Sequence, residues 1–255
     1  MRKLFVIGIG AGDPDYMTVQ AIKALNEVDV FFVIEKGGEK HDLVALRREI
    51  LERYVEDPSY RVVDVRDPER DRTTPAYREA VEDWRRRRAE VWEQAIRDEL
   101  QDGQRGGFLV WGDPALYDST LAVLDGILAR GALEFDHEVI PGITSVQALA
   151  ARHRVPLNRV GGSVQITTGR RLARGFPEES DDVVVMLDAD CTFNQVASAG
   201  VDIYWGAYIG TDDEALVAGP LDDVKEEIER VRGEARERKG WIMDTYLLTR
   251  GPRSG

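Results

Sequence analysis

LFVIGIGAGDPDYM, residues 4–17, joins an apolar run to three glycines that are separated by single residues. An apolar run of this length before glycines predicts a buried β-strand that ends in a tight turn. Dinucleotide-binding enzymes place their phosphate loop after such a strand, so a nicotinamide-dependent oxidoreductase is one hypothesis.

The loop departs from a phosphate loop in its spacing and in its charge. Gly8, Gly10 and Gly12 give G-x-G-x-G instead of G-x-G-x-x-G, and Asp13-Pro14 follows directly. Asp13 would bring a carboxylate close to the phosphates, and Pro14 has no N–H to offer them. The loop therefore predicts a ligand crevice that does not bind phosphate.

Glu35, after the next predicted strand, could imitate the acid that binds a ribose, so the oxidoreductase stays an alternative. The first helix is expected to start near Thr18, some distance after the glycines. The glycines then serve a tight turn and let another backbone or a ligand approach closely.

Two further segments repeat the arrangement of an apolar strand followed by a turn. FLVWGDPALYDST, residues 108–120, again places Gly-Asp-Pro after a strand, and VIPGITSVQALAARHRVPLNR, residues 139–159, turns at Pro141-Gly142. Thr144 or Ser145 can cap a helix that begins at about residue 146. Because the carboxyl ends of parallel strands meet at one edge of a sheet, the segments predict one shared crevice.

The composition is that of an ordinary globular protein. Of 255 residues, 43% are hydrophobic and 32% are charged, and the formal net charge is -13. That charge argues against binding to nucleic acid or to anionic membranes. The single cysteine, Cys191, excludes an internal disulfide and a cysteine zinc site, the three histidines are scattered, and we expect a cytoplasmic protein without a metal.

Short β-branched runs alternate with helical patterns, which predicts an α/β fold with much parallel sheet. The predicted strands of the first half are residues 4–9, 30–34, 60–65, 107–111 and 138–140. Further strands in SVQITTG, DVVVML, VDIYWGAYIG and WIMDTYLLTR, with fewer helices between them, predict a second domain with a mixed sheet. We place the two domains at residues 1–115 and 116–255.

Two charged helices are also expected. One runs from about Thr74 to about Leu100 and contains the run Arg85 to Arg88, which forms either a solvated face paired with nearby Glu and Asp residues or a clamp for substrate carboxylates. The other covers residues 222–239 as an amphipathic surface helix.

With these elements in order, the sequence resembles the tetrapyrrole methylase family, which uses S-adenosylmethionine to methylate uroporphyrinogen III and the precorrins. The segments that carry the resemblance are GIGAGDPDYMTVQA, WGDPALY, PGITSVQALAA and VPLNR. The resemblance implies two α/β domains, a mainly parallel N-terminal sheet and a mixed C-terminal sheet, with the methyl donor held between them. It also implies a homodimer, and the absence of phosphate in the donor explains the Asp-Pro loop.

The resemblance further implies which residues bind the donor. Asp113 is the natural partner for the donor's ammonium group, because a charged hydrogen bond is strong. Ala11 occupies a position that is often proline in relatives. The implied set is Ala11, Trp111, Gly112, Asp113, Leu116, Thr144, Ser145, Met186, Leu187, Gly206, Ala207 and Thr245.

The segments ITTGRRL, IYWGAYIGT and KGWIMDTYLL are similar to one branch of the family, whose members methylate C-1 of precorrin-5 and release acetate to give precorrin-6A. Another precorrin or uroporphyrinogen methyltransferase of the family is the alternative. Methyl transfer needs positioning more than a protein nucleophile. Loss of the acetyl group needs a base, for which His137, Asp188 and Tyr117 are possible choices.

The tetrapyrrole substrate carries several carboxylates, so a net negative protein needs a local basic patch to hold it. Arg170 and Arg171 follow the predicted strand in ITTG and are the leading candidates, with Arg159 as a weaker one. Each of the three could equally form a surface ion pair.

Overall fold

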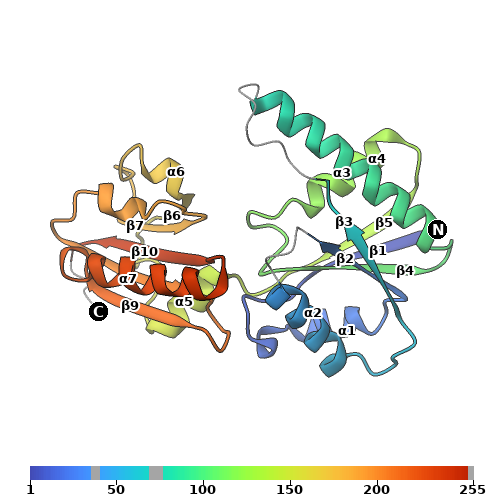
Figure 1. Cartoon of the computed structure of the whole chain (residues 1–255), viewed down its shortest axis with the longest axis horizontal. Helices are drawn as coiled ribbons and strands as arrows, with labels where there is room; N and C mark the ends of the chain where they lie inside the picture. The colour runs from blue at the N-terminus through green and yellow to red at the C-terminus, as the bar shows by residue number, and fades with distance from the viewer. Residues whose placement is uncertain (36–40, 69–76, 252–255) are drawn as a thin grey trace. The chain divides into compact units, whose positions relative to one another are not determined.

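A computed structural model describes residues 1–35, 41–68 and 77–251 (Figure 1). The chain divides into two compact units. Unit 1 contains Met1–Gly10 and Pro14–Ile143, and unit 2 contains Ala11–Asp13 and Thr144–Gly255.

Unit 1 is built on a parallel five-stranded sheet with the order β3-β2-β4-β1-β5. Its strands are β1 Arg2–Gly8, β2 Val30–Glu35, β3 Arg61–Arg66, β4 Arg105–Val110 and β5 Phe135–Ile140. Because all strands run in one direction, the loops after β1, β4 and β5 lie at the same edge of the sheet. The predicted parallel sheet is confirmed.

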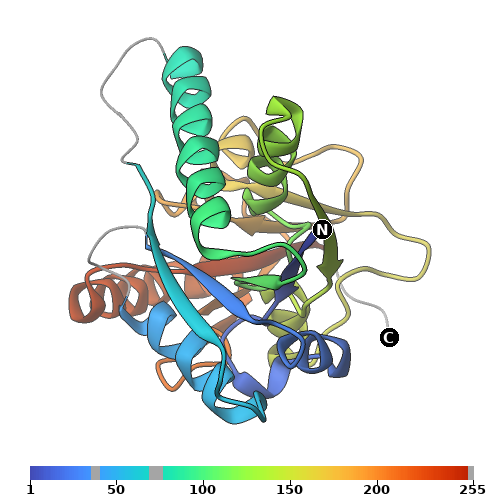
Figure 2. The ribbon, with the colours of Figure 1, turned by 90° about the vertical axis from the view of Figure 1, so that its right-hand side faces the viewer.

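Helices cover both faces of this sheet, as Figure 2 shows. The helices of unit 1 are α1 Val19–Leu25, α2 His41–Tyr54, α3 Tyr77–Glu99 and α4 Thr120–Arg130. Trp92 and Ile96 of α3 pack with α4 against one face, whereas Leu25 of α1 and Ile50 of α2 pack against the other. The expected start of α3 at Thr74 lies outside the described residues.

The structure differs from the sequence-based division at residue 115. Strand β5 pairs with β1 along its length, from Arg2 with Phe135 to Ile7 with Ile140. Residues 116–143 therefore belong to unit 1, and unit 2 resumes at Thr144. Because β1 and β5 are more than a hundred residues apart in the chain, no local sequence pattern shows that they pair, and the boundary could not be predicted.

Unit 2 contains a mixed sheet with the order β6-β7-β10-β8-β9, in which β6 and β7 are parallel and the other pairs are antiparallel. Its strands are β6 Val164–Thr168, β7 Asp182–Met186, β8 Val201–Ala207, β9 Ala215–Pro220 and β10 Asp244–Arg250, and its α-helices are α5 Ser145–His153, α6 Gly169–Leu172 and α7 Leu221–Lys239. Both the mixed sheet and the amphipathic helix α7 are confirmed. Strand β9 was not predicted from the sequence, because it ends in Gly-Pro. A proline is tolerated there because β9 is an edge strand, which has a hydrogen-bonded neighbour on one side only.

The arginines of the run in α3 differ in their exposure and in their ion pairs. Arg86 and Arg87 form ion pairs with Asp83 on the surface of the helix. Arg88, in contrast, is 1% exposed, pairs with Asp67 at 2.8 Å and lies over the Trp92 ring. The solvated face is confirmed for the first two, and the clamp is wrong for Arg88, which fastens the helix to the end of β3.

Candidate functional site

The three predicted loops of unit 1 meet backbone to backbone. The amide of Gly112 donates to the Gly10 carbonyl at 2.7 Å, and a Cβ atom added to Gly8 would lie 2.6 Å from the Gly142 nitrogen. A Cβ atom on Gly142 would overlap the carbonyl oxygen of Gly112. The glycines are therefore required by close packing of the loops after β1, β4 and β5.

Asp113 joins two of these loops through its carboxylate. Its Oδ1 accepts a hydrogen bond from the Ala115 amide at 2.7 Å, and its Oδ2 accepts one from the Gly142 amide at 2.8 Å. The side chain is half-buried. A carboxylate has about four lone-pair sites, so two remain for a ligand.

The loop after β1 does not open directly into a helix. A short 3-10 turn, Pro14–Tyr16, follows the glycines, and α1 begins only at Val19 with Thr18 as its N-cap. The Thr18 hydroxyl accepts a hydrogen bond from the Ala21 amide at 3.0 Å, so this amide at the start of the helix already has a partner. The start near Thr18 is confirmed, and the pyrophosphate geometry of an oxidoreductase is not present.

Trp111 and Tyr117 lie in the segment after β4. The Trp111 Nε1 atom is buried and has no hydrogen-bond acceptor among the residues that the structure describes. An indole N–H in that state is ready to donate to a ligand or to water. Tyr117 is 48% exposed and holds a φ of 52°, an uncommon backbone conformation that often marks functional loops.

In unit 2, Thr144, one of the two residues predicted as the cap, caps α5. Its hydroxyl accepts a hydrogen bond from the Gln147 amide at 3.4 Å, and the Gln147 side chain accepts one from the Thr144 amide at 2.8 Å. This reciprocal capping box fixes the start of the helix. Ser145, the first helical residue, is half-buried.

The end of β7 presents an exposed leucine in an unusual conformation. Leu187 directly follows the strand, is 68% exposed and has a φ of 54°. A non-glycine residue in this region costs about 1–2 kcal/mol, so the surrounding structure must hold it there. Met186 before it is half-buried, and both predicted residues offer apolar surface to a ligand.

Three other predicted residues of unit 2 lie inside its packing. A Cβ atom on Gly206 would lie 2.9 Å from the Leu149 side chain, so the glycine makes room for α5. Ala207 is fully buried, and the hydroxyl of Thr245 donates to the Val185 carbonyl at 2.9 Å. The structure therefore gives these three a packing role at the ends of β8 and β10, where Thr245 pairs with Gly206 and with Met186 of β7. Their contacts with the donor stay a prediction.

Ala11 and its neighbours pack with unit 2. Ala11 is 1% exposed, and a Cβ atom on Gly12 would lie 2.9 Å from the Thr211 side chain and still closer to the Ile209 carbonyl oxygen. The glycine lets this short segment approach the turn after β8 at backbone distance.

The candidate substrate arginines separate into two groups. Arg170 and Arg171 are exposed on α6, directly after β6. Arg159 donates instead to the Thr249 hydroxyl at 3.2 Å and to the carbonyl oxygen of Arg250, which favours a structural role at the end of β10.

Arg47 on α2 is an arginine near the site that the sequence pattern does not predict. The Nε atom of Arg47 on α2 donates to the Leu109 carbonyl at 3.1 Å, close to the end of β4. Burial lowers the pKa of Arg47, and the charge of Asp118 opposes that shift. Nothing in an amphipathic helix rich in arginine distinguishes this residue from its neighbours.

The structure also separates the three candidate bases. His137 lies within β5, paired with Leu4, three residues before the strand ends. Asp188 is 6% exposed and accepts several hydrogen bonds. Tyr117 alone of the three has an exposed side chain in a loop after a strand.

Within the described parts of the chain, no group of three or more His, Cys, Asp or Glu residues could hold a metal ion. None of the helices seen in those parts is long and apolar enough to cross a membrane.

Comparison with known proteins identifies the family. The model of Tetrapyrrole (Corrin/Porphyrin) Methylases matches residues 3–225. A precorrin-6A synthase (deacetylating) from Sinorhizobium sp is 49% identical over 251 residues, which cover 98% of this chain and 96% of that protein.

Solved structures agree with this match. CobF from Corynebacterium diphtheriae, described as a cobalamin synthesis related protein, is 36% identical with a TM-score of 0.86 and covers 99% of this chain and 100% of that one. A uroporphyrin-III C-methyltransferase from Thermus thermophilus, in complex with S-adenosylhomocysteine, shares the fold at a TM-score of 0.58 and 17% identity over 97% of both chains. These matches overturn the oxidoreductase alternative, and the chain belongs to the tetrapyrrole methylase family.

Proposed function

We propose that this chain uses S-adenosylmethionine to methylate ring carbon C-1 of precorrin-5 and, with water, releases acetate to give precorrin-6A. The observation that carries the proposal is its likeness, over almost the whole chain, to the deacetylating precorrin-6A synthase of Sinorhizobium. The reaction belongs to the synthesis of the corrin ring.

The residues at the strand ends fit the chemistry of the donor. In unit 1, Asp113 keeps lone pairs for an ammonium group, and the N–H of Trp111 has no acceptor among the described residues. In unit 2, Leu187 offers exposed apolar surface. S-adenosylmethionine supplies an electrophilic methyl group on a sulfonium, and it carries an ammonium and no phosphate, as the Asp-Pro loop requires.

The contribution of the protein is mainly positioning. Holding two reactants in line replaces a bimolecular encounter and can supply several kcal/mol of the barrier. Asp113 would contact the ammonium group of the donor, and the exposed guanidinium groups of Arg170 and Arg171 would hold substrate carboxylates by paired hydrogen bonds. Tyr117, the candidate base with an exposed side chain, would serve for proton transfer during loss of the acetyl group.

Replacing both Arg170 and Arg171 with alanine is expected to raise the KM for precorrin-5 by about tenfold or more, because two charged hydrogen bonds are lost. The affinity for S-adenosylhomocysteine should stay unchanged. Steady-state kinetics and calorimetry measure the two quantities. The Arg230→Ala variant is the matched control, because Arg230 is an arginine of α7 paired on the surface with Glu234. An unaltered KM in the double variant would remove these arginines from the substrate site.

The proposed function is tested by offering labelled S-adenosylmethionine with precorrin-5 and, separately, with uroporphyrinogen III. The expected result is methyl transfer to precorrin-5 alone. Transfer to uroporphyrinogen III would assign the chain to another reaction of the family. Calorimetry should also show binding of S-adenosylhomocysteine and no binding of NADH.

A further inference from the structure

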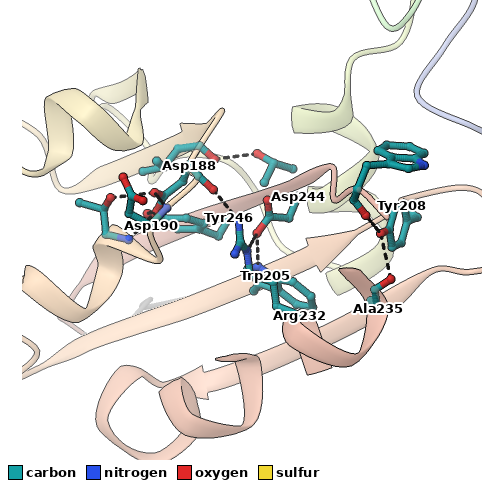
Figure 3. A network of polar contacts seen from close by, with 12 residues as sticks. Asp188, Asp190, Trp205, Tyr208, Arg232, Ala235, Asp244 and Tyr246 are labelled. Carbon is teal, nitrogen blue, oxygen red and sulfur yellow. Dashed lines mark hydrogen bonds and ion pairs between the residues drawn. The ribbon is translucent and has the colours of Figure 1, made fainter. Parts of the chain in front are cut away.

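Asp188 lies at the centre of a buried polar network in unit 2, shown in Figure 3. It follows Leu187 at the end of β7 and is 6% exposed. Its Oδ1 accepts from the Thr192 hydroxyl at 2.7 Å and from the Asp190 amide at 3.1 Å. Its Oδ2 accepts from the Tyr246 hydroxyl at 2.6 Å and from the Thr192 amide at 2.7 Å.

These four hydrogen bonds fill the acceptor capacity of one ionised carboxylate. Burial, and after it the nearby Asp188 charge, raises the pKa of Tyr246, so the phenol keeps the proton that it donates. Asp188 therefore has no lone pair left to take a proton from water, and its earlier candidacy as the base for deacetylation is wrong. Its bonds instead connect the end of β7 to β10 and to the turn that contains Thr192.

The same carboxylate also lies against the start of α6. A Cβ atom on Gly169 would lie 2.6 Å from the Asp188 Cγ atom, so the helix that carries Arg170 and Arg171 begins in contact with Asp188. On the other side of the network, the Arg232 Nη2 atom donates to the Asp188 carbonyl at 2.8 Å. Arg232 also pairs with Asp244 at 2.9 Å, which extends the network across the sheet from α7.

Two candidate binding elements, Leu187 and the start of α6, thus adjoin a single side chain. Leu187 keeps a φ of 54° while 68% exposed, so its own packing cannot hold it in that conformation. The hydrogen bonds of the following residue can hold it, because they fix the chain on both sides of the turn. The contact with Gly169 couples this turn to α6.

We propose that Asp188 is a positioning residue. It holds Leu187 in its donor-binding conformation, and it fixes the start of α6, and thereby Arg170 and Arg171, relative to Leu187. This role rests on the proposed function, since it assumes that Leu187 contacts the donor. Asp188 acts through the turn and does not itself touch the donor or the substrate.

The test compares Asp188→Asn with the wild-type protein at a temperature where circular dichroism shows both to be folded. An asparagine retains the shape and loses part of the acceptor capacity, so affinity for S-adenosylhomocysteine should fall by about tenfold. Hydrogen exchange of the amides of Leu187 to Thr192 should become faster. The control is Asp182→Asn, a fully buried carboxylate at the opposite end of β7 that accepts from Thr249 at 2.5 Å. It should alter stability without altering affinity.

A second pair of variants covers the case in which Asp188→Asn does not fold. Thr192→Val removes the hydroxyl that donates to Asp188, whereas Thr192→Ser keeps it. The valine variant should bind S-adenosylhomocysteine several-fold more weakly, and the serine variant should bind as the wild type does. If Asp188→Asn and Thr192→Val both bind S-adenosylhomocysteine as tightly as the wild type, the positioning role is overturned. If Asp188→Asn does not fold, wild-type affinity in Thr192→Val is sufficient to overturn it. A wild-type protein that binds no S-adenosylhomocysteine would instead overturn the donor site.

Discussion

Gly142→Ala is expected to lower the free energy of unfolding by about 3 kcal/mol or more, because the added methyl group has no space. Its Cβ atom would overlap the Gly112 carbonyl oxygen and lie 2.8 Å from the Gly8 carbonyl carbon, and both are backbone atoms that cannot rotate away. A loss of this size corresponds to a fall in Tm of roughly 6–12 °C. Calorimetric unfolding of the variant measures it.

Gly126→Ala is the matched control for this substitution. Gly126 lies within α4, where a Cβ atom would meet the Ala89 side chain at an ordinary 3.8 Å. An alanine there should stabilise the protein by about 0.5–1 kcal/mol, since glycine is a poor helix former. Equal Tm values for Gly142→Ala and the wild type would contradict the packing of the three loops.

Asp113→Ala is expected to weaken binding of S-adenosylhomocysteine by about 1.5–3 kcal/mol, the cost of losing a charged hydrogen bond. The substitution also removes the acceptors for the Ala115 and Gly142 amides, so stability should fall as well. Asp113→Asn separates the two effects, because its amide oxygen retains an acceptor while the negative charge is lost. Calorimetry should show weaker binding with a smaller change in Tm.

A ligand without the ammonium group provides the control for this prediction. 5′-Methylthioadenosine retains the adenosine and the sulfur but has no amino-acid portion. Its affinity should be the same for Asp113→Asn and for the wild type. An equal loss of affinity for both ligands would mean that Asp113 acts through the loop structure and does not pair with the ammonium.

Local sequence patterns were sufficient to predict most elements of the fold. The apolar runs before glycine gave β1 and β4, and the helical spacing after residue 222 gave α7. The capping of α5 by Thr144 could also be predicted, because a capping residue acts on its own neighbours. These features depend on interactions between residues that are close in sequence.

Features that depend on distant residues could not be predicted in this way. The burial of Arg88 depends on its ion pair with Asp67, which lies beyond the start of α3, and no periodicity distinguishes Arg88 from Arg86 and Arg87. In the same way, the sequence does not show that the side chain of Leu149 lies where a Cβ atom of Gly206 would stand.

The same limit applies to Asp188. Its hydrogen-bond donors come from the following turn and from β10, fifty-eight positions along the chain in the case of Tyr246. A sequence shows that such a residue can be acidic and near a strand end, but it cannot show that its acceptor sites are already filled.

If one reaction both methylates the ring and removes the acetyl group, the two products must form in a fixed ratio. Purified protein is incubated with precorrin-5 and labelled S-adenosylmethionine, and transferred methyl groups and free acetate are counted separately in each sample. We expect equimolar amounts of transferred methyl groups and acetate at every time point. Methylated product without acetate would contradict this expectation and would assign the chain to a methyltransferase of the same family that leaves the acetyl group in place.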